Sequence, residues 1–513
     1  MNIGLAVTRS ALRYPASPAV FDDDRVLDYR GLDERSSRVA NYLLDRFGIE
    51  RGDKVVLLTE NRIEVLEVLY GVAKAGGVYV GLNFRLTEAE YEDILENAEP
   101  RLLIASSQFE GLAASLAEKL DIDVVDLDAP GPDGHEQLLA AAAATPPPTL
   151  HRVRPEDDFC LVYTSGTTGR PKGVLFDHRA VLQHATVCLL EYGLTQDSRW
   201  LTALPHNSSV QITMVPLILA GGAIAMLESR GFDGVRFAEA VKRHAITHSY
   251  LVPTMLFRLL DQVPSAEDLG SIETIGYGAA PMPPERIREL LERYGSRFNQ
   301  LYGMVEISSI GTMLRKEDHA HALAVNPDRL ASCGQSSYAI DVRVVDEAGA
   351  DVGVGRRGEV VFGGPYLMKG YYRDPSRTAE ALRDGWMHSG DVGQFDEDGF
   401  LYIVDRIKDM IICGGHNVLP TEIENVLYEH DGVLEASVVG LPDKEWGESI
   451  LAVVAPRGDR QIDAEELLRW CKERGLPTIM MPRRIEFLDS LPKNAVGKIA
   501  KRDLREAFAP AAE

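Results

Sequence analysis

The chain has 513 residues, 45% hydrophobic and 26% charged, an ordinary globular composition and enough length for two to four domains. A net charge of −24 argues against nucleic-acid and anionic-membrane binding, because both require a positive field. Five widely spaced cysteines form neither a disulfide framework nor a zinc ligand set, so a reducing cytoplasm is the expected compartment. The N-terminus lacks a signal-peptide pattern, and the longest apolar run, 214–227, is too short to span a membrane.

Short runs rich in Val, Ile and Leu alternate with helical segments over the first two thirds of the chain. In the first array we expect strands in DKVVLLTEN, GGVYVGL and RLLIAS and helices over 63–74 and 88–97. After the low-complexity connection 140–148, strands are expected in FCLVYT, TALP, GGAIAML, THSYLVP and TIGYGAA. This spacing predicts βαβ units and largely parallel sheets covered on both faces.

From about residue 341 the pattern changes. Shorter strands in DVRVVDEAGADVG and GEVVFGG, joined by Gly/Asp turns, indicate an antiparallel or barrel-like subdomain. A fresh α+β pattern follows, with helices expected over 420–429 and 464–474. The predicted fold is therefore α/β: a large N-terminal region, 1–406, of stacked βα sheets plus a β-barrel-like subdomain, and a small mobile α+β C-terminal domain, 407–513.

The stretch YTSGTTGRPKG, residues 163–173, directly follows the apolar strand FCLV. A Gly-, Ser- and Thr-rich stretch is most often only a flexible loop. Here, however, glycines that permit a tight backbone path alternate with hydroxyl groups and precede a lysine, which suits phosphate oxygens. We therefore predict a phosphate-binding loop that is not a Walker loop. Its candidate residues are Thr164, Ser165, Gly166, Thr167, Thr168, Gly169 and Lys172.

This loop resembles the one found in the adenylate-forming superfamily of acyl-CoA synthetases, aryl-CoA ligases, luciferases and peptide-synthetase adenylation domains. Further motifs continue the resemblance in order along nearly the whole chain. YGMVE, 302–306, resembles Y-G-x-T-E, and GYGAAP, 276–281, resembles the S-G-A-A-P strand end. The resemblance implies that Tyr302 packs against adenine and that Glu306 and Thr167 hold Mg²⁺. It adds Gly278, Ala279, Ala280 and Gly303 to the nucleotide-binding residues.

The C-terminal third carries three more motifs of this family. HSGD, 388–391, and DRIKD, 405–409, resemble T-G-D and R-x-K-D, which implies that Asp391 binds the ribose hydroxyls, Arg406 binds the nucleotide and Lys408 is the hinge of the C-terminal domain. PKNAVGKIAKR, 492–502, resembles P-x-x-x-x-G-K and makes Lys498 the adenylation lysine. A positioned cation suits this reaction, because a carboxylate must attack a polyanion.

The acyl and thiol sites follow from the same resemblance. The segment PHNSSVQI is about two residues shorter than its family counterpart, and we place His206 at the family's histidine position, with a catalytic and acyl-binding role. Apolar neighbours indicate a hydrophobic acyl group. The remaining acyl-binding candidates are Gln211, Tyr277, Gly278, Met304 and Val305, and the coenzyme A entrance is expected at Gly414, Gly415 and Trp446.

The resemblance implies an ATP-dependent, AMP-forming acid–thiol ligase. ATP, Mg²⁺ and coenzyme A are the expected cofactors and co-substrates, a small carboxylic acid is the substrate, and a monomer or homodimer is expected. The first alternative is a stand-alone adenylating enzyme that passes its acyl-AMP or acyl group to a separate carrier protein or partner enzyme. Luciferase-type oxidation has no specific support. A catalytically dead nucleotide-binding module is disfavoured, because Thr167, Lys172, Glu306, Asp391, Arg406 and Lys498 are all present.

Val305 replaces the threonine of Y-G-x-T-E, whose hydroxyl contacts the α-phosphate in the family. Losing a hydrogen bond to a charged group costs roughly 1.5–3 kcal/mol, on the order of ten- to a hundredfold in rate if felt in the transition state. We expect Val305→Thr to keep or raise the rate of pyrophosphate release. A collapse of that rate in a folded variant would show instead that the valine serves the acyl pocket.

Overall fold

The structure is a computed structural model that describes residues 1–164, 171–208, 210–226, 231–444, 446–458, 460, 462–493 and 498–509. Its first sheet has seven described strands in the order β18-β8-β7-β4-β3-β5-β6. Their bounds are Gly370–Tyr371, Lys172–Asp177, Asp158–Thr164, Val78–Gly81, Lys54–Leu58, Leu102–Ala105 and Asp123–Asp126. Strands β7 to β6 run parallel, whereas β8 is antiparallel to β7. The predicted phosphate loop therefore joins an antiparallel pair and does not lead into a helix.

The second sheet has nine described strands in the order β15-β14-β13-β12-β11-β9-β10-β1-β2. Their bounds are Gln335–Ser336, Thr312–Leu314, Phe298–Tyr302, Thr274–Gly278, His248–Leu251, Arg199–Thr202, Ala223–Met226, Pro18–Phe21 and Val26–Asp28. Strands β13 to β1 are parallel, with antiparallel strands added at both edges. Parallel strands end at the same edge of a sheet, so the residues that follow β12 and β13 lie near each other.

Helices connect and cover these strands. Their bounds, from α1 to α13, are Ile3–Arg13, Tyr29–Phe47, Glu64–Ala75, Glu88–Ala98, Glu110–Leu120, His135–Ala141, His178–Tyr192, Val215–Ala220, Gly234–His244, Pro253–Gln262, Pro284–Tyr294, Lys316–Ala324 and Pro375–Ala381. Local signals explain several ends: Asp28 and Asp177 accept hydrogen bonds from first-turn amides of α2 and α7, and left-handed Gly48 and Gly193 end the same helices. Every residue of α3 is buried, as expected of a helix enclosed by other layers.

A third, antiparallel sheet follows in the order β16-β17-β20-β19, with β21 paired to β20. These strands span Asp341–Val345, Gly358–Gly363, Trp386–Phe395, Leu382–Arg383 and Leu401–Arg406. The C-terminal part then holds β22 Ile411–Cys413, β23 His416–Val418, α14 Pro420–Tyr428, β24 Val433–Asp443, β25 Gly447–Pro456, α15 Ala464–Glu473, β26 Arg484–Phe487 and α16 Lys501–Phe508. Its buried apolar clusters draw only on residues from Ile411 onward.

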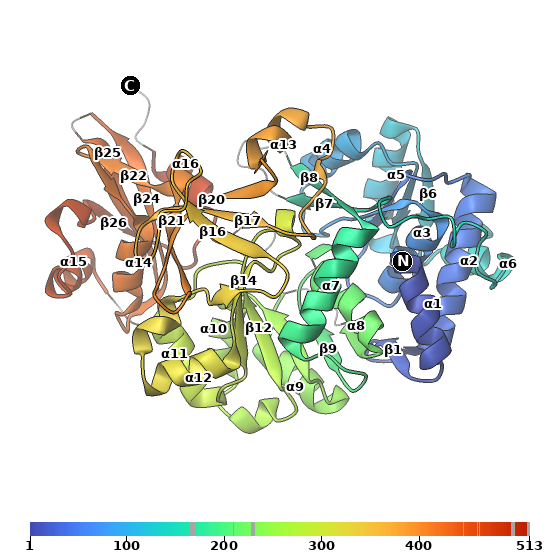
Figure 1. Ribbon diagram of the computed structural model, residues 1–513, viewed down its shortest axis with the longest axis horizontal. Coiled ribbons are helices and arrows are strands. Elements are labelled where there is room, and N and C mark those ends of the chain that lie inside the picture. The colour runs from blue at the N-terminus through green and yellow to red at the C-terminus, as the bar shows by residue number, and fades with distance from the viewer. Residues whose placement is uncertain are drawn as a thin grey trace.

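Figure 1 shows the C-terminal strands β22, β24, β25 and β26 at one end of the molecule and helices α1 to α3 at the other, with β16, β17, β20 and β21 beside the C-terminal strands. The predicted α/β fold, with mainly parallel sheets, an antiparallel subdomain and an α+β C-terminal part, is confirmed. Among the described helices, none combines the length and apolar character needed to cross a membrane.

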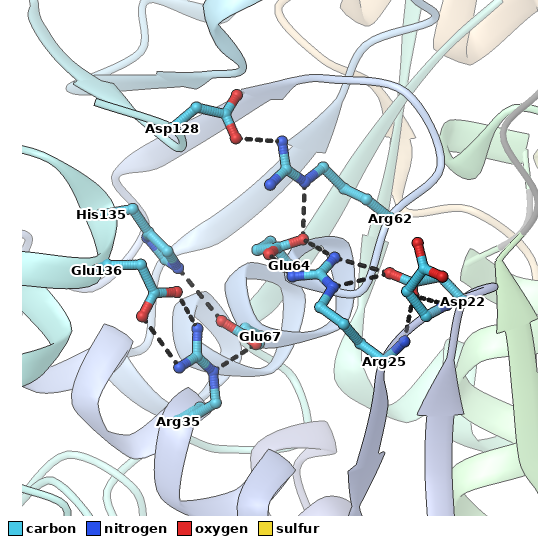
Figure 2. A network of polar contacts seen from close by, with 10 residues as sticks. Asp22, Arg25, Arg35, Arg62, Glu64, Glu67, Asp128, His135 and Glu136 are labelled. Carbon is cyan, nitrogen blue, oxygen red and sulfur yellow. Dashed lines mark hydrogen bonds and ion pairs between the residues drawn. The ribbon is translucent and has the colours of Figure 1, made fainter. Parts of the chain in front are cut away.

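A buried ionic network joins α2, α3 and α6 in the N-terminal region (Figure 2). Glu67, only 1% exposed, accepts from Arg35 Nε at 2.6 Å and lies 3.2 Å from His135 Nε2. Burial would raise the pKa of nearby Glu64, but hydrogen bonds from Arg62 and Arg25 outweigh it and hold that pKa well below its usual range. Carboxylates this deeply buried need such partners to remain charged.

We expect Arg35→Ala to lower the midpoint of thermal unfolding by several degrees, because among the described residues it leaves the buried Glu67 carboxylate with His135 alone. Breaking a buried pair in this way costs about 3–5 kcal/mol. Arg46→Ala is the matched control on the same helix, since Arg46 and its partner Asp133 are both solvent-exposed and such a pair contributes about 1 kcal/mol or less. Equal shifts for the two variants, measured by calorimetry, would show that the network does not stabilise this region.

Candidate active site

Asp391 lies where strands from two sheets meet. Tyr302, the last residue of β13, donates from its hydroxyl to Asp391 Oδ2 at 2.8 Å. Arg406, the last residue of β21, donates from Nε to Asp391 Oδ1 at 3.1 Å and is its cross-strand neighbour. Each carboxylate oxygen has two lone pairs, so both can still accept hydrogen bonds from a ligand. The structure thus brings together three of the residues predicted to bind a nucleotide.

The turn that carries Asp391 is held by Glu359 of β17, which the sequence analysis did not single out. Its carboxylate lies 2.8 Å from His388 Nδ1 and accepts from the Gly390 amide at 3.1 Å. Ser389 Oγ adds a bond to the Val360 carbonyl at 2.6 Å. No sequence motif marks Glu359, because its role depends on a cross-strand pairing.

Lys498, from the C-terminal part, lies in the same electrostatic environment. Burial and the nearby Arg406 charge lower the pKa of Lys498 to about 8, while Asp391 and Glu306 oppose that shift. Lys408 behaves similarly: burial and the charges of Arg406 and Lys172 lower its pKa, and Asp409 and Asp391 oppose them. Coulomb interactions thus link both lysines to Arg406 and Asp391, Lys408 also to Lys172, and Lys498 also to Glu306. Such a concentration of cations suits a polyanion.

Glu306 is buried in a short 3₁₀ turn, Val305–Ile307, and accepts a hydrogen bond from the Tyr371 hydroxyl at 2.7 Å. Lys172 Nζ lies 4.9 Å from the centre of the Tyr371 ring. Tyr371 therefore connects Glu306 to the strand that follows the phosphate loop, a role that nothing in its sequence context indicated. The turn is tightly built: a Cβ at Gly303 would lie 2.3 Å from the Ser309 carbonyl oxygen, and Ser308 has a φ of 58°.

The chemistry of this carboxylate fits a magnesium ion bound together with a nucleotide, which needs only one or two protein carboxylates besides phosphate oxygens. Among the described residues, no group of three or more His, Cys, Asp or Glu side chains is placed to form an all-protein metal site. Thr164 and Lys172 are cross-strand neighbours at the base of the phosphate loop. The loop candidates Ser165, Gly166, Thr167, Thr168 and Gly169 lie outside the described residues.

The end of β12 has two different faces. A Cβ at Gly276 would lie 2.3 Å from Tyr192 Oη, and one at Gly278 would lie 3.0 Å from Tyr250 Oη and 2.2 Å from the Leu301 carbonyl oxygen. Both positions therefore require glycine. Ala279 follows with a φ of 67°, so the chain turns sharply away from the strand.

Tyr277 lies on the opposite face of β12, where its hydroxyl contacts Gln300 at 3.1 Å and His319 at 2.8 Å. It is fully buried there. We therefore correct the expectation that Tyr277 lines the acyl pocket. The strand alternation contained this information, since Tyr277 must face away from Gly276 and Gly278.

A small cavity of about 10 Å³, with room for about one water, lies beside Tyr250. Its walls combine apolar and hydroxyl-bearing side chains, including Trp200, Leu204, Ile212, Thr202, Thr213 and Tyr250. Because the Tyr250 hydroxyl is next to Gly278, this cavity adjoins the strand end predicted to bind the nucleotide.

His206 and Gln211 are buried near this cavity, His206 in the 3₁₀ turn His206–Ser208 and Gln211 in the π-helix Val210–Met214. His206 Nδ1 lies 3.1 Å from the Tyr79 hydroxyl, and burial lowers its pKa to about 4, so the ring is neutral at pH 7. Within the described part of the chain, neither His206 Nε2 nor Gln211 Nε2 has a hydrogen-bond partner. Met304 and Val305 are half-buried at the end of β13.

The predicted thiol-entrance residues form a separate group on the C-terminal part. Gly414 and Gly415 make the turn between β22 and β23, both with positive φ. The Gly414 amide donates to the Trp446 carbonyl at 2.8 Å, and a Cβ at Gly414 would lie 2.8 Å from the Trp446 ring. Arg483 stacks on that ring with its guanidinium carbon 4.0 Å from the ring centre.

Family models and known proteins match the chain over nearly its whole length. Residues 7–372 match the model of the AMP-binding enzyme family, and residues 422–498 match that of the AMP-binding enzyme C-terminal domain. The chain is 37% identical over 513 residues to a feruloyl-CoA synthase from Amycolatopsis sp, with 99% of each chain covered. It is 32% identical over 507 residues to the fatty acid–[acyl-carrier-protein] ligase ScoC of Streptomyces coeruleorubidus, covering 96% of this chain and 94% of ScoC.

Among solved structures, ATP-bound MatB from Rhodopseudomonas palustris superimposes with a TM-score of 0.88 at 30% identity, with 99% of each chain covered. The apo structure of the same protein gives a TM-score of 0.78 over the same coverage. The arrangement described here is therefore closer to the ATP-bound structure than to the apo one.

Proposed function

The chain belongs to the AMP-binding enzyme family, and from that premise we propose that it joins a carboxylic acid with an apolar acyl group to coenzyme A. It is an ATP-dependent, AMP-forming ligase. The observation that carries the proposal is the placement of Lys498, from the C-terminal part, among Arg406, Asp391 and Glu306. This is where a cation is needed when a carboxylate attacks the α-phosphate of ATP.

In the first half-reaction, a carboxylate oxygen of the acid forms a bond to the α-phosphorus of ATP. The bond from that phosphorus to the oxygen bridging the α- and β-phosphates breaks, and pyrophosphate leaves. Lys498 offsets the repulsion between the two anions and stabilises the negative charge that develops on the α-phosphate. Arg406 and Lys172 hold the phosphates, and Asp391 accepts hydrogen bonds from the ribose while Tyr302 packs against adenine.

Glu306, together with Thr167 of the phosphate loop, is the proposed magnesium site. Bound there, Mg²⁺ would neutralise phosphate charge and orient the triphosphate. The hydrogen bond from Tyr371 fixes the Glu306 carboxylate, as outer partners of metal-binding carboxylates do.

In the second half-reaction, the C-terminal domain turns about Lys408, which moves Lys498 away and brings Gly414, Gly415 and Trp446 to the acyl-adenylate. The coenzyme A thiol releases its proton to water, and its sulfur bonds to the acyl carbon. The bond from that carbon to the phosphate oxygen breaks, and AMP leaves. Two chemistries can then share one site because the domain exchanges one set of groups for another.

The acyl group is proposed to lie beside Gly278 and to extend toward Tyr250. The cavity there has room for about one water, so an acyl group must displace the side chains around it. Trp200, Leu204 and Ile212 give that cavity apolar walls, and His206 is neutral at pH 7. The likeness to a feruloyl-CoA synthase supports an apolar, aryl-bearing acid. A carrier protein is the alternative acceptor of the acyl group. The similarity to ScoC, a fatty acid–[acyl-carrier-protein] ligase, supports this second candidate.

A panel of carboxylic acids tests this function. We expect aryl-propenoic and medium-length alkyl acids to release pyrophosphate at least about tenfold faster, in kcat/KM, than acetate or malonate, because apolar burial discriminates by such factors. Addition of coenzyme A should convert the activated acid to its thioester, detected by mass spectrometry. Pyrophosphate release without thioester formation would favour the carrier-protein alternative, and faster activation of malonate would contradict the apolar acyl group.

The pH dependence tests the role of Lys498. Its pKa of about 8 means that the charged form is present below pH 8 and is lost as the pH rises through that value. We expect kcat/KM for ATP, which reports on the free enzyme, to fall above about pH 8 in the pyrophosphate-release assay. Lys498→Arg should be slower but should lack this alkaline decline, because a guanidinium stays charged. Lys493→Arg, five residues earlier, should keep the wild-type profile; a wild-type rate that stays flat to pH 9.5 would contradict the assignment.

A further inference from the structure

One buried hydrogen bond crosses from the large region to the C-terminal part, far along the chain from the catalytic motifs. Arg286, near the start of α11, donates from Nη2 to the carbonyl oxygen of Val433, the first residue of β24, at 3.0 Å. Arg286 is only 4% exposed. A buried guanidinium requires partners for its charge, so this contact is a specific one.

The strand geometry explains why Val433 can accept this bond. Strand β24 is at the edge of its sheet, next to β25. The Arg457 amide donates to the Gly432 carbonyl, so by the alternation of an antiparallel ladder the next carbonyl, that of Val433, points away from β25. No strand of the described sheet offers it a donor on that side, and the guanidinium supplies one.

Arg286 is held in position from its own side. Its Nη1 donates to both oxygens of Glu289, one turn along α11, at 3.0 and 3.3 Å. Its guanidinium carbon lies 5.6 Å from the centre of the Phe257 ring of α10. An arginine ordered in this way loses little conformational freedom when the C-terminal domain docks against it.

The surroundings of this contact are polar. A cavity of about 230 Å³ lies beside the contact, lined by polar side chains that include Glu285, His430, Asp431, Arg457 and Arg474. A second ionic contact between the two parts, Arg357 with Glu422 at 3.4 Å, is about half exposed on both sides. Such an interface separates readily, because water can replace most of its contacts.

We propose that Arg286 is a positioning residue for the first half-reaction: its bond to Val433 holds the C-terminal domain in the arrangement that places Lys498 in the active site. This inference rests on the proposed function, in which the domain turns about Lys408 between the two steps. Rotation separates Val433 from Arg286, so the bond stabilises the first arrangement alone. A hydrogen bond from a charged donor shifts such an equilibrium roughly ten- to a hundredfold.

The test measures the two half-reactions separately in the full-length enzyme. The first is pyrophosphate release from acid and ATP, and the second is the coenzyme-A-dependent consumption of chemically prepared acyl-adenylate. We expect Arg286→Ala to slow the first at least about tenfold and to leave the second within twofold of wild type or faster. Arg286→Lys keeps the charge but cannot donate to Glu289 and Val433 with the planar geometry of a guanidinium. Its rate of pyrophosphate release should lie between those of the wild type and Arg286→Ala.

Two controls remove exposed arginines nearby. Arg288→Ala, on the same helix, and Arg357→Ala, at the exposed interdomain pair, should change either half-reaction by less than about threefold. Thermal unfolding identifies any variant that fails to fold. If Arg286→Ala does not fold, the rates of Arg286→Lys in the two half-reactions decide the test. Equal slowing of both half-reactions, or no slowing of the first, would overturn the inference. A wild-type enzyme that does not consume acyl-adenylate with coenzyme A would instead contradict the proposed acceptor, while the pyrophosphate assay would still test Arg286.

Discussion

The active site depends on cations being held close to one another in a chain whose net charge is −24. Burial lowers the pKa values of Lys408 and Lys498, and repulsion among Lys172, Arg406 and these two lysines lowers them further. Glu306 and Asp391 offset part of it. The resulting local field attracts a polyanion despite the unfavourable charge of the whole molecule. Since Lys498 reaches the cluster from the C-terminal part, the charge of the site depends on where that part is docked.

Much of the fold could be predicted because it follows from local pattern. Apolar runs bounded by turns located the strands from Lys54–Leu58 to Thr274–Gly278, and helical periodicity located α3 and α4 to within a residue or two. The direction of β8 could not be predicted, because strand pairing is decided by contacts distant in sequence. The phosphate loop consequently joins an antiparallel pair, where a strand–loop–helix arrangement is the more familiar setting.

The candidate site also contains residues that could be predicted from the sequence and residues that could not. Residues within motifs, such as Asp391, Arg406 and Lys498, could be proposed because their motifs resemble those of a known family. Glu359 and Tyr371 could not, since each acts across a strand pair and neither stands in a recognisable pattern. Arg286 escaped notice for a further reason: its partner is a backbone carbonyl, which leaves no trace in the sequence. Tyr277 was misassigned because the prediction took it together with its neighbours Gly276 and Gly278. Its side chain lies on the opposite face of the strand.

The glycines of β12 have a consequence for how the proposed site is divided among elements. Gly276 and Gly278 present bare backbone to Tyr192 of α7 and Tyr250 of β11, and Tyr250 also lines the small cavity. The walls of that cavity thus come from elements beside the strand, while the strand itself continues into the proposed nucleotide-binding turn. Under the proposed function, a substitution at Tyr250 changes the acyl-binding surface and leaves the strand that leads to the nucleotide unaltered. The proposed site thus draws its acyl-binding and nucleotide-binding surfaces from different elements.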